Sequence, residues 1–157
     1  MPDRKPPRLA SAELPTLHAL WQYQRESLVR KVTDVGEAAA RRSPVASGTS
    51  LLWLVKHMAR AEILWVLVRF AGEDLELPGD TVTEDDTLDG AIAAYRATWA
   101  RVDAVALGRD LGELCHEPDV EPVPNLRWVV MHLLEETARH AGHADIIREL
   151  IDGQAGR

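Results

Sequence analysis

A polar stripe on an otherwise apolar helix constrains this chain more than any other sequence feature. The segment after Asn125 repeats apolar residues at helical spacing, including Val129, Leu133 and Ile147. At about 100° per residue, titratable side chains fall on the same side of that helix: His132, Glu136, His140 and His143. Burying carboxylates and imidazoles is costly unless each is paired, hydrogen-bonded or bound to a metal. A bound cation is the simplest single partner for all of them.

The spacing within the stripe favours a metal site. Glu136 and His140 are four residues apart, so one helical turn brings both side chains to the same side. A third candidate ligand is His57, which lies between Leu54 and Ala61 on another strongly apolar segment. Two helices with inward-facing imidazoles indicate a shared site between them, as in bundle cores that bind metals. Two histidines and a carboxylate with an open position are a common catalytic zinc arrangement, which also suits iron or nickel.

Two segments carry a family resemblance. HLLEETARHAGHADIIRELIDG (residues 132–153) and SGTSLLWLVKHMARAEILW (residues 47–65) resemble the signature segments of the DinB-like superfamily, particularly its actinobacterial mycothiol-dependent branch. The resemblance extends from about Pro15 to Gly153. It implies a four-helix bundle with a metal triad supplied by helices two and four. Many relatives have two histidines on the last helix, whereas the pair Glu136 and His140 resembles the mycothiol-dependent maleylpyruvate isomerase type. His143 falls where relatives often have glutamine, which implies that it supports a ligand.

The hydrophobic periodicity and the capping residues predict an all-α fold with four long helices. The first helix is expected from about residues 11–15 to 35, and the second from a cap at Thr49 or Ser50 to residues 71–72. Thr87 is the expected cap of the third helix, and Asn125 that of the last. Residues 40–48, 73–86 and 108–124 are expected to be connections. We predict loose tails at residues 1–10 and 154–157 around a single domain at 11–153.

Composition excludes several classes of function. The chain has 157 residues, 46% of them hydrophobic, which is enough for one domain with a substantial core. Its net charge of −7, with basic residues scattered among acidic ones, disfavours nucleic acid as a partner. Cys115 is the only cysteine, so no intramolecular disulfide can form and the chain is expected to be cytoplasmic. No apolar run resembles a signal peptide or reaches membrane-spanning length without charges.

The remaining histidines and the cysteine have weaker signals. His132 either extends the polar stripe towards a pocket mouth or is an ordinary helix-face histidine. His18 and His116 show no spacing signal and are expected at the surface. Cys115 lies beside His116 in a loop, but a single thiol without a placed base is more often incidental.

Charged and aromatic residues near the stripe also have two readings. Arg139 and Asp145 are either part of a salt-bridge network that orients the last helix, with Asp145 near Arg148, or part of a solvated face. Three tryptophans are expected to fill the core by default: Trp53, Trp65 and Trp128. Any of them that lies near His57 could instead form a wall of the pocket.

The resemblance favours metal-dependent S-transfer or isomerisation of a small electrophilic substrate, with mycothiol as the thiol co-substrate. In this hypothesis His57, Glu136 and His140 bind a divalent ion, of which zinc is preferred, and His143 or Arg139 orients a ligand or moves a proton. The alternatives are a non-catalytic, metal-stabilised helical binding module and a metal-assisted hydrolase. A homodimer is expected, because helix one or helix three should offer an apolar face beyond the needs of the core.

Overall fold

The protein is almost entirely helical in this computed structural model, which describes residues 5–117 and 121–155. In chain order the helices are α1 (Glu13–Val32), α2 (Glu37–Arg41), α3 (Leu51–Glu62), the π-helix η1 (Ile63–Phe70), α4 (Leu88–Ala106) and α5 (Leu126–Asp152). Among the described residues, β-structure is limited to an isolated antiparallel bridge between Leu114 and Asn125. The predicted all-α class is therefore confirmed.

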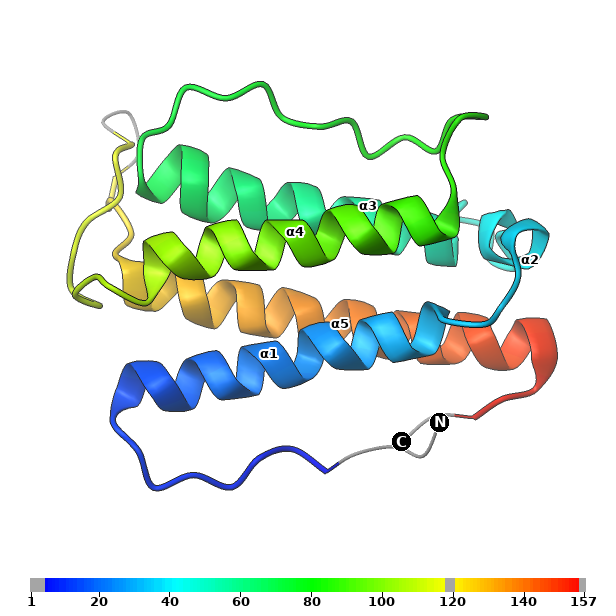
Figure 1. Cartoon of the computed structure of the whole chain (residues 1–157), viewed down its shortest axis with the longest axis horizontal. Coiled ribbons are helices and arrows are strands. Elements are labelled where there is room, and N and C mark those ends of the chain that lie inside the picture. Colours follow the sequence, from blue (N-terminus) through cyan, green and yellow to red (C-terminus); the bar gives the residue numbers. More distant parts are fainter. Residues whose placement is uncertain (1–4, 118–120, 156–157) are drawn as a thin grey trace.

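The long helices form a bundle in which α1 lies along α5, and α3 packs against both α4 and α5 (Figure 1). The second predicted long helix corresponds to α3 together with η1, and the last corresponds to α5. These two are neighbours, as predicted. None of the helices in the described part of the chain is long and apolar enough to span a membrane. Residues 5–10 and 154–155 are irregular and exposed, and the other residues of the predicted tails, 1–4 and 156–157, lie outside the described residues.

Side-chain caps fix where α3, α4 and α5 begin, whereas α1 starts without one. Ser50 accepts a hydrogen bond from the backbone N–H of Trp53, and Thr87 accepts one from Gly90. Asn125 caps α5 in the same way, three residues before Trp128. All three caps agree with the sequence prediction, because each satisfies an N–H group that the first helical turn leaves unpaired.

Two features of the helices differ from the prediction. The connection after α1 contains the short helix α2, and the second long helix changes from α to π geometry at Ile63. A π-helix has i→i+5 hydrogen bonds, and it occurs mostly as single-turn insertions within α-helices, frequently at functional sites. Its wider turn has no sequence pattern of its own, so the uninterrupted apolar run in this region predicted an ordinary helix.

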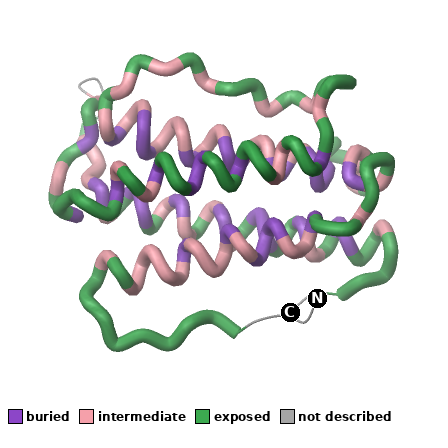
Figure 2. The backbone as a smooth tube through the Cα atoms, in the orientation of Figure 1, coloured by how far each residue is buried: buried purple, intermediate pink, exposed green. Residues whose placement is uncertain are grey.

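The core consists of two hydrophobic clusters along the bundle, and the buried residues line the inner faces of the helices in Figure 2. One cluster includes Leu54 of α3 and Ile147 of α5. The other includes Phe70 of η1 and Val129 of α5. The same helix pair therefore contributes to both clusters, and this holds α3 with η1 firmly against α5.

A buried polar network joins α1, α3 and α4. The guanidinium of Arg25 donates two hydrogen bonds to Glu62, at 2.9 and 2.7 Å, and both side chains are fully buried. The hydroxyl of Tyr95 donates to the same carboxylate at 3.1 Å, and Arg25 also donates to Asp103 at 2.8 Å. His18 is partly exposed and lies 3.0 Å from Asp103, so this histidine, expected at the surface, also contacts the network.

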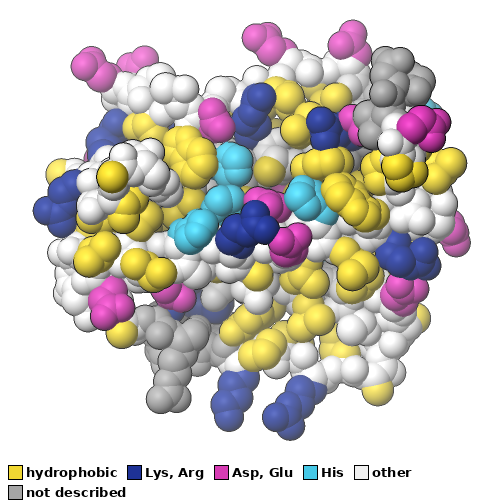
Figure 3. Space-filling model, turned by 180° about the vertical axis from the view of Figure 1, so that it is seen from behind, with side chains coloured by type: hydrophobic (Ala, Val, Ile, Leu, Met, Phe, Trp, Pro, Cys, Tyr) yellow, Lys and Arg dark blue, Asp and Glu magenta, His cyan; other side chains and the backbone are white. Residues whose placement is uncertain are grey.

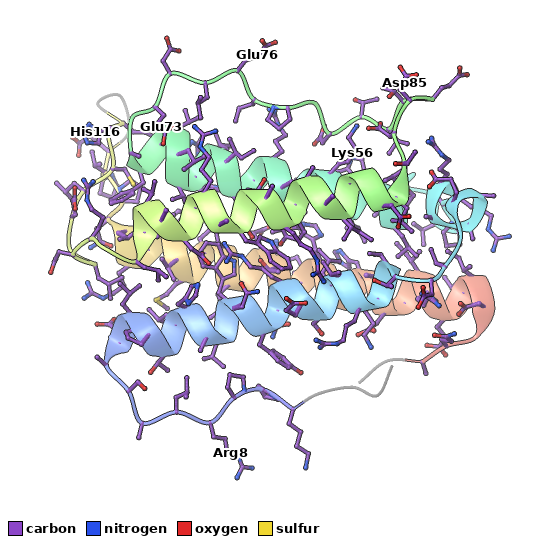
Figure 4. The ribbon with its side chains drawn as sticks, viewed as in Figure 1. Arg8, Lys56, Glu73, Glu76, Asp85 and His116 are labelled. Atoms are coloured by element: carbon purple, nitrogen blue, oxygen red, sulfur yellow. The ribbon has the colours of Figure 1, made fainter. Side chains whose placement is uncertain are left out.

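The connection between η1 and α4 crosses the outer side of α3 and is held there by basic side chains. Lys56 donates to the carbonyl of Thr81 at 2.7 Å and pairs with Asp86 at 2.6 Å. Arg60 donates to the carbonyl of Pro78 at 2.9 Å. Glu76 and Asp85 point outwards from this connection in Figure 4. The loop is thus fixed over the helix that carries His57.

Candidate metal centre

The candidate triad comes together at the contact between α3 and α5. His57 of α3 and Glu136 and His140 of α5 each offer one ligand atom, and these atoms all lie within 4.8 Å of one another. The carboxylate of Glu136 and Nε2 of His140 are 3.3 Å apart, as expected for residues separated by one helical turn. The ring centroids of His57 and His140 are 5.0 Å apart. Packing of the two helices therefore assembles the residues that the sequence singled out.

The imidazole of His57 is held on two sides. Its Nδ1 lies 3.4 Å from a carboxylate oxygen of Asp80, in the loop that crosses α3. Its ring stacks on Trp53, with centroids 4.6 Å apart and an angle of 14° between the planes. A carboxylate on one ring nitrogen fixes the tautomer and leaves the other nitrogen free. Asp80 was missed because no spacing rule links a loop residue to a helix position 23 residues earlier.

The imidazole of His140 is buried and electrically neutral near pH 7. Burial, with the nearby charge of His57 as the next cause, lowers its pKa to about 4. With Nε2 facing Glu136, the Nδ1 atom of His140 lies 3.3 Å from Nδ1 of His143. His143 itself is exposed. A neutral imidazole retains a lone pair, which is the form that binds metals.

Glu136 is half-buried and has a cationic neighbour on its own helix. Arg139 donates a hydrogen bond to Glu136 at 2.7 Å and also bonds Glu135. Arg139 is therefore in position to hold the carboxylate of Glu136. Asp145 is not part of this group, because it pairs with Lys31 of α1 at 2.8 Å.

The donor set fits a divalent metal ion. Ligand atoms about 2 Å from zinc are roughly 3–4 Å apart from each other, so the observed separations require only small side-chain adjustments. Two imidazole nitrogens and one carboxylate oxygen suit zinc, iron or nickel, and three protein ligands leave a position for another molecule. His57 and Glu136 are partly exposed, so solvent reaches the candidate ligands.

Aromatic rings extend the same face beyond Glu136. The ring of His132 stacks on Trp128 with centroids 4.8 Å apart, and it meets the edge of Trp65 at the same distance. Trp128 is 46% exposed, so the default expectation that it fills the core was wrong. Histidine side chains gather near the middle of this face in Figure 3, among hydrophobic groups and with acidic and basic groups between them.

Cys115 and His116 take no part in this site. Cys115 is buried, and burial raises the pKa of its thiol, which disfavours the reactive thiolate. His116 is exposed, as expected, at the end of the bundle near Glu73 (Figure 4). The interpretation of Cys115 as incidental therefore agrees with its environment.

A small pocket adjoins the candidate centre at His143. It has a volume of about 250 Å³ and is lined by Val45, Ser47, Thr49, His143, Ile146 and Ile147. Three of its lining residues are aliphatic and three are polar, and they come from the end of the connection before α3 and the second half of α5. The candidate centre therefore has an apolar recess on one side and the aromatic rings on the other.

Fold and site together define an all-helical bundle with a two-histidine, one-carboxylate centre between two neighbouring helices. A model of the mycothiol-S-transferase family matches residues 16–153, and the chain belongs to this family. The resemblance to the mycothiol-dependent branch of the DinB-like superfamily is thereby confirmed.

A comparison with solved structures bears on the fold. A crystal structure described as a conserved protein of locus from Enterococcus faecalis is similar to this chain, with a TM-score of 0.64 and 18% sequence identity. The match covers 92% of this chain and 100% of that one. At this identity the similarity establishes a shared fold alone. No curated protein matches the sequence significantly.

Proposed function

We propose that this protein is a metal-dependent S-transferase that joins mycothiol to a small electrophilic substrate. The observation that supports this most strongly is the approach of His57, Glu136 and His140 to within 4.8 Å in a chain of the mycothiol-S-transferase family. We also propose a cytoplasmic location, which the single cysteine supports.

In this proposal Nε2 of His57, the Glu136 carboxylate and Nε2 of His140 hold one divalent ion, preferably zinc. When bound, the ion supplies positive charge that favours the thiolate form of a thiol near neutral pH. Glu136 offsets part of that charge, so its carboxylate helps to set how strongly the thiol is acidified.

The neighbouring residues position the ligands. Asp80 and Trp53 orient His57, and Arg139 holds Glu136. If Nε2 of His140 is a ligand, its Nδ1 carries the proton and donates to Nδ1 of His143. That hydrogen bond occupies the accepting nitrogen of His143, so we assign His143 an orienting role.

The proposed transfer needs only the thiol and the electrophile. The thiol loses its proton to solvent, and its sulfur forms a bond to an electrophilic carbon of the substrate. In a substitution, the leaving group departs with the electron pair of the bond that breaks. In an addition, that electron pair moves to another atom of the substrate, which then takes up a proton. The apolar recess beside His143 suits the less polar part of such a substrate.

Metal analysis of single variants tests the ligand assignment. Purified wild type is expected to hold about one ion per chain, and His57→Ala or His140→Ala should lose most of it because each removes one of three ligands. His116→Ala is the matched control, since His116 is an exposed histidine outside the site. Full metal content in His57→Ala, Glu136→Ala and His140→Ala would overturn the triad.

A thiol-consumption assay tests the reaction. Metal-loaded wild type should consume mycothiol in the presence of a panel of alkyl halides, epoxides and activated alkenes, and metal removal should abolish this. Glu136→Gln should lower the rate at least about tenfold while leaving the thermal melt almost unchanged, because it removes charge but keeps shape. Wild-type consumption no faster than in buffer across the panel would contradict the enzyme and favour a binding module.

A further inference from the structure

A second pocket lies on the same side of the bundle, and the candidate metal centre does not account for it. Two indole rings, Trp65 and Trp128, line it, and the ring of His132 packs against both of them. The centroids of Trp65 and Trp128 are 5.1 Å apart, and His132 contacts both rings at 4.8 Å. Trp128 is 46% exposed, so the cluster presents a large indole surface to solvent.

Charged groups accompany the aromatic wall. The guanidinium of Arg69 lies 4.2 Å from the ring centroid of Trp65 and pairs with Glu117 at 2.7 Å. The pocket has a volume of about 610 Å³. It is lined by Trp65, Arg69, Glu117, Pro122, Val123, Pro124, Asn125 and Trp128. A pocket of this size accommodates a small molecule, since such sites typically span roughly 300–1,000 Å³.

The helical register relates the aromatic wall to the candidate metal centre. His132 precedes Glu136 by four residues on α5, which is about one turn or 6 Å along the axis. Trp128 precedes Glu136 by eight residues, or about 12 Å. An elongated ligand can therefore have one end at the triad and the other against the indoles.

We propose that this pocket binds the glucosaminyl-inositol part of mycothiol, while its cysteine reaches towards the triad. This rests on the proposed function. Mycothiol carries its thiol on a cysteine joined to two linked six-membered rings that bear many hydroxyl groups. The C–H faces of such rings pack against flat indoles, and their hydroxyls bond to charged groups such as Arg69 and Glu117.

The recess beside His143 is less suitable for this part of the thiol. Its volume of about 250 Å³ is below the usual range for small-molecule sites, and half of its lining residues are the aliphatic Val45, Ile146 and Ile147. A pseudo-disaccharide placed there would lose water from many hydroxyls, and the polar lining residues Ser47, Thr49 and His143 offer no carboxylate or guanidinium such as those of Glu117 and Arg69. The two pockets therefore divide the two substrates, with the polar thiol at the indoles and the electrophile at the aliphatic recess.

Direct binding of the cysteine-free fragment tests the proposal without the reaction. Glucosaminyl-inositol, titrated into metal-free protein, should change the tryptophan fluorescence and give a saturable calorimetric signal. Trp128→Ala should weaken binding at least about tenfold, and Arg69→Gln should weaken it independently. Met131→Ala is the control, because Met131 is an exposed hydrophobic residue of α5 outside the pocket lining. Absent wild-type binding, or equal binding by Trp128→Ala, would overturn the proposal.

A comparison of two thiols separates this proposal from the proposed function. With mycothiol, Trp128→Ala should raise KM about tenfold or more, whereas the slower reaction with N-acetylcysteine should be unchanged because that thiol lacks the rings. Equal effects on both thiols would overturn the ring-binding role while the S-transferase stands. Fragment binding by a wild type that consumes neither thiol would support the pocket and overturn the S-transferase.

Discussion

The orientation of His57 depends on residues from two different segments of the chain. Trp53 stacks on the ring from one turn earlier in α3, and Asp80 approaches Nδ1 from the loop. Only the first of these contacts is local in sequence. The candidate centre thus depends on the position of the loop as well as on the two helices.

We predict that Asp80→Asn weakens zinc binding about tenfold. Carboxylates that bond the outer nitrogen of a ligating histidine usually contribute roughly 10–100-fold to metal affinity. Competition with a chromophoric chelator measures the affinity. Asp85→Asn is the control, because Asp85 lies in the same loop and points outwards (Figure 4). Equal zinc affinity of the two variants would show that Asp80 does not position His57.

Among the elements, α4 illustrates how a cap defines a helix. Thr87 has extended backbone geometry, and its hydroxyl oxygen accepts the N–H of Gly90. The preceding loop is anchored separately, through Lys56 and Arg60 of α3. Glu37 of α2 also accepts the backbone N–H of Leu88 at 2.8 Å, so two side chains cap the first turn of α4 where the loop ends.

Thr87→Ala should lower the free energy of unfolding by about 1 kcal/mol, the usual cost of losing a threonine cap. Urea unfolding followed by circular dichroism measures this change. Thr81→Ala provides the comparison, since Thr81 is an exposed threonine of the preceding loop that contributes its backbone carbonyl to Lys56. Equal stability of the two variants would argue against the cap.

The π-helix η1 is the element that sequence periodicity failed to predict. It begins directly after Glu62, whose side chain faces Arg25, and it carries Trp65 and Arg69 to the aromatic pocket. In an α-helix, residues three and four apart share a face, whereas the wider π turn brings residues five apart into register. Trp65 and Arg69 are four residues apart and would share a face in an α-helix as well, so the apolar pattern missed the π turn itself and not the pairing of these two side chains.

At the scale of the whole molecule, Glu62→Ala should destabilise the bundle by roughly 3–5 kcal/mol, because it leaves the buried guanidinium of Arg25 without its main partner. Chemical unfolding measures the loss. Glu13→Ala removes a similar pair with Arg127 at the surface and should leave the stability nearly unchanged. A Glu62→Ala variant as stable as Glu13→Ala would show that the buried network is dispensable.

The homodimer stays a prediction, but its expected surface changes. The apolar excess was expected on the first or third long helix, which are α1 and α4. In the described part of the chain, the exposed large hydrophobic residues of the helices instead lie on α5: Trp128, Met131, Ile146 and Leu150. Light scattering at micromolar concentration should give twice the mass of one chain, and Leu150→Glu should lower it. A wild-type mass of one chain would exclude the dimer.

The sequence by itself determined the features that depend on neighbours a few residues apart. Helical spacing and caps predicted the long helices, and the stripe with Glu136 and His140 predicted the candidate ligands on α5. His57 was predicted because an imidazole interrupts an apolar face. These signals are readable because helix geometry repeats every few residues, so local order fixes which side chains share a face.

Tertiary structure decided the contacts between residues distant in the chain. Packing of α3 against α5 set the spacing of the triad, and the loop after η1 brought Asp80 to His57. The pairing of Arg25 with Glu62 likewise joins α1 to α3 through two residues that are 37 positions apart in the sequence. No local periodicity specifies such pairs, because they are selected by how whole helices bury their apolar faces and by the need to satisfy each buried charge.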